Sequence, residues 1–245
     1  MDDILAISMQ PRYVMKDIKR RFKFKNDKVE APSSYLGAGL RKKVINGWDC
    51  WTVTSFDYVK SAVATVEEAV KKITKQLPNK VIIPMVQSYL LEIEATKELE
   101  PDNIQFFHEL IGMLRWASEI GRVDVLLETS FLSQYQASPR EGHMVQAMHI
   151  FACLKKKPKL TLYYDPGLPR MDYSNFQTKR DDFLEYYRHA AELMPHHQPR
   201  PRGWPVTTTV FMDASHAANR KTRKSHTGYL IFINRAPIIL YSKNN

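Results

Sequence analysis

Met1-Asp2-Asp3-Ile4-Leu5-Ala6-Ile7-Ser8 is the stretch that best predicts how this chain folds. Two adjacent carboxylates are followed there by a short apolar run that is typical of a buried strand. Because ionised groups are costly in the dry interior of a sheet, a tight turn between two strands is the favoured place for Asp2 and Asp3. At such a tip they could hold two divalent cations roughly 3.5–4 Å apart, as two-metal phosphoryl transfer requires. The alternative is a solvated acidic N-terminus.

The composition is that of a globular chain. Its 245 residues are enough for one large domain or two smaller ones, and 44% of them are hydrophobic and 25% charged. No apolar run approaches the roughly 20 residues of a membrane span, and no signal-peptide pattern is present. Cys50 and Cys153 lie far apart and are predicted to be reduced core residues. The sequence therefore predicts an intracellular protein that is not secreted and has no membrane partner.

The charge favours a polyanionic partner. The formal net charge is +10, from 36 basic and 26 acidic side chains. Nucleic acid is the commonest partner of such a chain, although solvated basic faces also occur in many proteins.

A basic helix is predicted to begin at Pro11, because proline is well tolerated in the first turn of a helix. Its apolar face would consist of Tyr13, Val14, Ile18 and Phe22. The remaining face is crowded with candidate phosphate contacts, namely Lys16, Lys19, Arg20, Arg21 and Lys23. Basic side chains with interleaved aromatics suit a nucleic-acid backbone, and a solvated helix face explains the pattern equally well.

Local signals predict a hairpin followed by a helical block. Asn46-Gly47 is a hairpin-turn signal before a strand over residues 48–53. Apolar residues spaced by three and four predict an amphipathic helix from Phe56 to Leu77. Asp102 is the predicted N-cap of the next helix.

The helical block continues to residue 158. Val123 to Tyr135 is predicted to be one helix, and Ser138-Pro139-Arg140-Glu141 has the capping-box spacing of another helix start. Helices joined by short links predict an antiparallel bundle.

The C-terminal part changes to strands. Leu160 to Tyr164 favours a strand, and the proline-rich segment from Asp165 to Pro205 is predicted to be a linker or insertion with one helix, Asp181 to Met194. Residues 206–213, 228–233 and 237–242 then predict an antiparallel meander. Asp213 at the end of the first strand is either a turn former or the first metal ligand of a nuclease site.

Three stretches, in one order, resemble the C-terminal part of the Pol polyprotein of copia-type LTR retrotransposons. The first is Asp2-Asp3-Ile4-Leu5, followed by Tyr35-Leu36-Gly37; the aromatic residue that precedes the acid pair in reverse transcriptases is absent here. The second is Phe107-His108-Glu109-Leu110-Ile111-Gly112-Met113-Leu114-Arg115-Trp116 with Arg122-Val123-Asp124-Val125 and Leu132-Ser133-Gln134-Tyr135. The third runs from Phe211-Met212-Asp213-Ala214-Ser215-His216 through Arg223-Lys224-Ser225-His226-Thr227-Gly228-Tyr229 to Tyr241-Ser242-Lys243.

This resemblance implies an α+β fold in four parts. Residues 1–55 would be the end of a reverse transcriptase palm, with a hairpin remnant, and residues 56–158 a helical thumb and connection bundle. Residues 159–206 would be a linker or insertion with one helix. Residues 207–245 would open a ribonuclease H-like domain as a truncated three-stranded antiparallel sheet.

The resemblance also implies a function, an RNA-directed DNA polymerase with ribonuclease H. Asp2 and Asp3 would be polymerase carboxylates on Mg²⁺, and Asp213 the first ribonuclease H carboxylate on Mg²⁺. The nucleic-acid contacts would be Lys16, Lys19, Arg20, Arg21, Lys23, Lys71, Lys72, Arg223 and Lys224. The partners would be an RNA/DNA template–primer or RNA–DNA hybrid and the remainder of the polyprotein, in a cytoplasmic virus-like particle or the nucleus.

Both implied metal sites need acids that this chain does not contain. A hairpin also needs a strand before its turn, so we expect a chain cut within an active site that alone catalyses neither reaction. The alternative is a catalytically inactive nucleic-acid-binding remnant. Three ribonuclease H strands without their covering helix leave one face of the sheet bare, and without the family's further strands they leave an edge unpaired. We therefore also expect a poorly ordered or aggregation-prone C-terminus.

Overall fold

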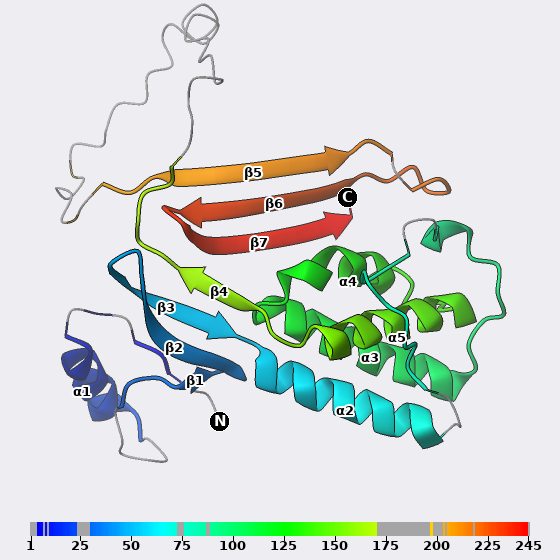
Figure 1. Ribbon diagram of the computed structural model, residues 1–245, viewed down its shortest axis with the longest axis horizontal. Helices are drawn as coiled ribbons and strands as arrows, with labels where there is room; N and C mark the ends of the chain where they lie inside the picture. Colours follow the sequence, from blue (N-terminus) through cyan, green and yellow to red (C-terminus); the bar gives the residue numbers. More distant parts are fainter. Residues whose placement is uncertain are drawn as a thin grey trace, which may run out of the picture.

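Figure 1 shows a computed structural model in which helices and two antiparallel sheets combine, which confirms the α+β class. The structure describes residues 4–6, 8, 10–23, 30–72, 76–86, 89–170, 197, 203, 205–217 and 219–244. Asp2, Asp3 and the predicted helix at residues 181–194 lie outside these ranges. The division of the chain into four parts stays a prediction.

The first sheet is built around the predicted hairpin. Its strand order is β1-β2-β3-β4, with bounds Ser34–Tyr35, Ala38–Ile45, Trp48–Thr54 and Thr161–Tyr164. Asn46 and Gly47 both have positive φ, 51° and 82°, which is the backbone that a two-residue hairpin turn requires. Strand β4 confirms the strand predicted at Leu160 to Tyr164, and it joins this sheet through pairs such as Thr161 with Thr54.

The helices follow the predicted apolar stripes. They are α1 (Pro11–Arg21), α2 (Phe56–Lys72), α3 (Pro101–Glu119), α4 (Leu126–Ser133) and α5 (Glu141–Lys156), with short 3-10 turns η1 (Leu91–Ile93) and η2 (Val123–Val125). Val59, Phe107 and Phe151 are fully buried where α2, α3 and α5 meet. These helices therefore share one hydrophobic core, and their arrangement as an antiparallel bundle stays a prediction. None of the helices within the described ranges is long and apolar enough to cross a membrane.

Two predicted helix starts are wrong. Glu100, not Asp102, is the N-cap of α3, because Pro101 already occupies the first helical position. Helix α5 begins at Glu141 with Arg140 as its N-cap, rather than at Ser138. The reason is that residues 139–140 are extended: the Pro139 carbonyl accepts a hydrogen bond from the Leu99 N–H, and Arg140 forms a β-bridge with Glu98.

The predicted helix from Val123 to Tyr135 is also divided. Its first three residues form η2, and α4 starts only at Leu126. Gly121, with φ 123°, turns the chain out of α3, and the Arg122 N–H closes that turn on the Ala117 carbonyl. The chain therefore enters α4 through a tight turn rather than through a regular helix.

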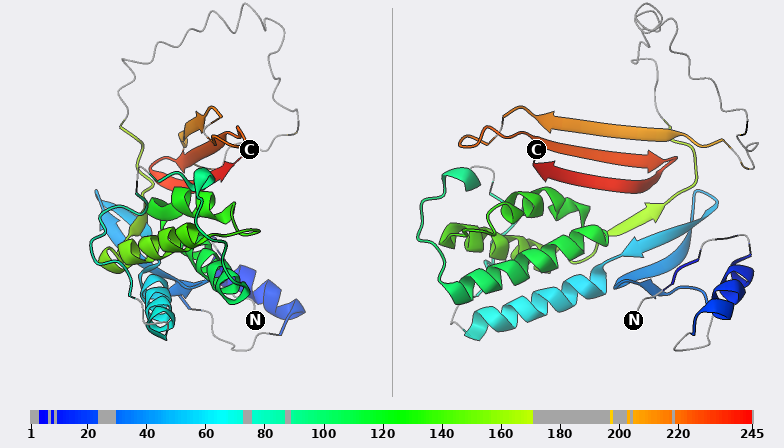
Figure 2. Two further views of the ribbon diagram at one scale, coloured as in Figure 1. Left: turned by 90° about the vertical axis from the view of Figure 1, so that its right-hand side faces the viewer. Right: turned by 180° about the vertical axis from the view of Figure 1, so that it is seen from behind.

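The second sheet is the predicted meander. Its order is β5-β6-β7, with bounds Thr208–Ser215, His226–Ile233 and Ala236–Asn244. Figures 1 and 2 show it alongside α4 and β4. One attachment is the Ser130 hydroxyl, which donates to the Ser242 carbonyl at 3.0 Å; another is the Arg235 guanidinium, 3.2 Å from the Asp165 carboxylate.

Candidate functional site

Asp213, the candidate nuclease carboxylate, lies on β5 with its side chain exposed. Gly228 is opposite it on β6, and Ser242 is opposite Gly228 on β7. These three positions form one row across the sheet, and Asp213 is its only acidic member.

Mg²⁺ does not fit this arrangement on the described residues alone. Asp213 is the only acidic residue from Pro205 to Asn245. Within the described ranges, no three His, Cys, Asp or Glu side chains come together as a metal site. Because Mg²⁺ is usually held by carboxylates, waters and substrate phosphates in octahedral geometry, one exposed carboxylate is a weak ligand set. Asp2 and Asp3 lie outside the described residues, so their metal roles stay predictions.

Helix α1 carries the largest group of predicted phosphate contacts. From Pro11 to Lys23 the chain has six basic residues and one acid, Asp17, which pairs with Arg20 at 3.1 Å. Lys16, Arg20, Arg21 and Lys23 are exposed and Lys19 is partly exposed. No residue of the helix is buried, and Tyr13 and Phe22 are 66% and 65% exposed.

The local sequence explains why these residues form a helix without a core. Pro11 is suited to the first turn, and Lys19, Arg20 and Arg21 lie at the negative end of the helix dipole. Isolated helices shorter than roughly 12–15 residues are marginal in water, and α1 has 11 residues. The predicted apolar stripe of α1 is therefore present but is not covered by the described part of the chain.

The other predicted basic residues are far from α1. Lys71 and Lys72 are exposed in the last turn of α2, where Lys72 lies 3.8 Å from Glu68. Arg223 and Lys224 are exposed in the loop between β5 and β6. In Figure 1, α1, the end of α2 and this loop occupy three separate regions of the molecule. The structure therefore does not bring the predicted contacts into one patch.

The β5–β6 loop contains two further cations that belong with Arg223 and Lys224. Arg220 and Lys221 are both exposed in the same loop. The Asn219 carboxamide oxygen accepts hydrogen bonds from the backbone N–H groups of Lys221, at 3.1 Å, and Thr222, at 2.8 Å. An asparagine that opens such a turn is a recognisable local signal, so this loop was predictable from the sequence.

Strand β2 supplies a basic surface that sequence reasoning missed. Arg41, Lys42 and Lys43 are all exposed. The Lys42 ammonium lies 5.2 Å from the centre of the Trp51 ring, and the Lys43 ammonium lies 5.8 Å from that of Tyr163. The run of three basic residues was visible, but its aromatic neighbours depend on the pairing of β2, β3 and β4.

Comparison with protein-family models, with curated proteins and with solved structures finds no match to this chain.

Proposed function

We propose that this chain binds nucleic acid, as a segment of a copia-type reverse transcriptase and ribonuclease H polyprotein. The proposal rests on helix α1. No residue of α1 is buried, and the helix presents five basic side chains and an aromatic ring to solvent. A phosphate backbone would neutralise the basic side chains, and nucleobases could stack on Tyr13 and Phe22. Binding would also compensate for the packing that α1 lacks.

The proposed parent enzyme copies RNA into DNA, and Mg²⁺ would there activate the primer hydroxyl and stabilise the leaving pyrophosphate. We propose no catalytic step for the described residues, because Asp213 has no second carboxylate on its sheet. The runner-up, a catalytically inactive remnant, predicts the same binding surface. If the purified protein extended a primer and the Asp2→Ala variant did not, the chain would be an active polymerase. That result would exclude a catalytically inactive remnant.

The binding proposal is tested by salt titration. The affinity for a labelled RNA–DNA hybrid would be measured by fluorescence anisotropy over a range of salt concentrations. In the variant Lys16→Gln/Arg20→Gln/Arg21→Gln, the slope of log K against log salt should become less negative by about 2 to 3, because each lost phosphate contact removes about 0.7–0.9.

A matched control separates phosphate contacts from net charge. Lys60, Lys80 and Lys156 are exposed lysines away from α1, and their change to glutamine removes the same total charge. We expect this triple variant to keep the slope of the parent protein. Equal slopes for the two triple variants would contradict a role for α1.

A further inference from the structure

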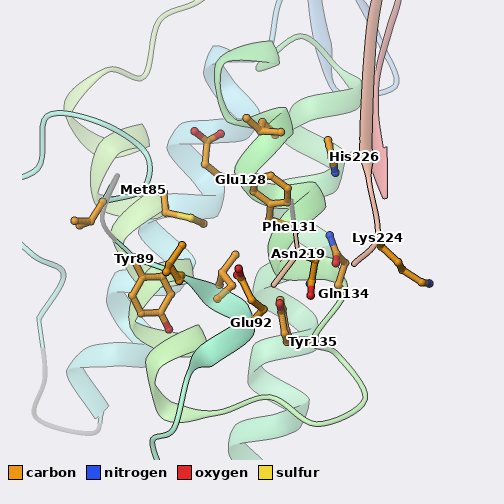
Figure 3. Close-up of a pocket in the computed structure, with 14 residues that line it drawn as sticks. Met85, Tyr89, Glu92, Glu128, Phe131, Gln134, Tyr135, Asn219, Lys224 and His226 are labelled. Carbon is orange, nitrogen blue, oxygen red and sulfur yellow. The ribbon is translucent and has the colours of Figure 1, made fainter. Parts of the chain in front are cut away.

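A pocket lies where the helical bundle meets the second sheet (Figure 3). Its volume is about 330 Å³, which lies at the lower end of the range for small-molecule sites. One wall consists of residues 85–86 and 89–92, another of α4 and the two residues that follow it, and the third of residues from the β5–β6 loop and the start of β6. None of the basic residues of α1 contributes to it.

The residues that line the pocket are mainly apolar and aromatic, and their net charge is negative. Met85, Phe131 and Tyr135 are among the lining residues. The ionisable carboxyl groups are those of Glu92 and Glu128. Lys224 is the cation among the described lining residues, and Figure 3 shows its side chain extending away from the others. A ligand in this pocket would therefore meet aromatic surface and negative charge.

Glu128 is a half-buried carboxyl group without a compensating cation. Burial, followed by the nearby Asp124 carboxylate, raises the pKa of Glu128 above its ordinary value. No described side chain donates it a hydrogen bond or forms an ion pair with it, and its own backbone N–H is the group that favours its charged form. A positively charged ligand would stabilise the Glu128 carboxylate, because an opposite charge offsets the cost of desolvation.

His226 provides a second polar contact from the β6 wall. Its side chain is only 7% exposed and stands 4.6 Å from the Phe131 ring, centre to centre. The Nε2 atom lies 2.7 Å from the Ser242 hydroxyl, whereas Nδ1 has no partner within the described residues. Burial lowers the pKa of His226, because it disfavours the charged form of the ring. When Nε2 donates to Ser242, Nδ1 is left as an acceptor for a ligand N–H.

We propose that this pocket binds a small aromatic amine, with its ring against Phe131, its ammonium at Glu128 and an N–H donor toward His226. The ligand is defined by complementarity: the walls are aromatic, the charge is negative, and the buried Nδ1 atom of His226 accepts from a donor in the tautomer whose Nε2 donates to Ser242. This site is separate from α1, the helix on which the proposed nucleic-acid binding rests.

Tryptamine is the probe, because it combines an indole ring, an indole N–H and an ammonium. Tryptophol is the matched ligand, since a hydroxyl replaces the amine on the same ring system. Calorimetric titration of the whole protein should show tryptamine binding about tenfold more tightly than tryptophol, as expected for one charge-assisted hydrogen bond. In Glu128→Gln this preference should vanish, while tryptophol binding is retained.

Glu119→Gln is the control variant, because Glu119 is an exposed acid on α3 outside the pocket lining. It should keep the preference for tryptamine. Nuclear Overhauser contacts between the indole ring and Phe131 in the unmodified protein provide a test that does not depend on a variant. Equal affinities for the two ligands, absence of tryptamine binding, or loss of the preference in Glu119→Gln would overturn the proposal.

Discussion

Among the described residues, Arg122 is the largest side chain that is completely buried, with 1% of its surface exposed. Its Nε and Nη2 atoms donate to the two oxygens of the Asp124 carboxylate at 2.8 and 2.7 Å. The remaining Nη1 atom has no partner among the described residues. A buried guanidinium is tolerated only when it is paired, so Asp124 is the residue that makes this packing possible.

Asp124→Ala should therefore destabilise the protein far more than a typical surface substitution. We expect a loss of about 3 kcal/mol in the free energy of unfolding, because an uncompensated charge remains buried. Urea denaturation measures this loss. The double variant Arg122→Met/Asp124→Ala should recover part of it, since no buried charge is left. A double variant that is less stable than Asp124→Ala would contradict this explanation.

This pair also shows what the sequence could not reveal at the residue scale. Arg122-Val123-Asp124 is visible in the chain, and both charged residues would ordinarily be expected at the surface. Burial of Arg122 depends on the tertiary packing around it, which is a non-local property. By contrast, the positive φ of Gly47 was predictable from the dipeptide Asn46-Gly47 alone.

At the scale of elements, α1 differs from the other helices because it has no buried residue. Met15→Pro should break α1, since proline removes a backbone hydrogen bond and clashes with the preceding turn. The melting temperature should nevertheless change by less than about 2 °C, because α1 packs on no core. Nucleic-acid affinity should fall several-fold, because the basic side chains lose their helical arrangement.

Met15→Ala is the control for this variant, because it removes the same side chain and preserves the helix. Circular dichroism, thermal melting and anisotropy titration with the RNA–DNA hybrid would be compared for the two variants. A large drop in melting temperature for Met15→Pro alone would show that α1 supports the fold. Unchanged affinity would show that its helical form is unimportant for binding.

Elements set by local signals were predictable, and those set by distant partners were not. The proline at the start of α1, the apolar spacing of α2 and the turn between β2 and β3 are all visible in a few residues. The predicted start of α5 was wrong because Pro139 and Arg140 pair with Leu99 and Glu98. Glu98 lies 42 residues before Arg140 in the chain. No capping pattern encodes such a pairing.

At the scale of the whole molecule, the sequence predicted the α+β class and the C-terminal meander but not how the parts join. Strand β4 was predicted as a strand, but its place beside β3 in the first sheet was not. Arg235 in the turn between β6 and β7 then pairs with Asp165, immediately after β4. The candidate pocket escaped sequence analysis for the same reason, because its walls come from segments far apart in the chain.

The second sheet ends in β5, an edge strand that no other described strand covers. Met212 on this strand is 75% exposed, and an apolar, unpaired edge is a template for pairing with another chain. Met212→Lys should therefore reduce concentration-dependent aggregation, measured by light scattering, and should change the stability by less than about 0.5 kcal/mol.

Ile82→Lys separates the effect of the edge from that of added charge. Ile82 is 79% exposed, but it lies in an irregular segment rather than on a strand. The two variants expose similar apolar surface before substitution and gain the same charge, so they differ chiefly in the unpaired backbone beside them. If pairing along β5 drives association, only Met212→Lys should suppress it. Equal suppression by both variants would assign the effect to net charge and leave the β5 edge without a role in association.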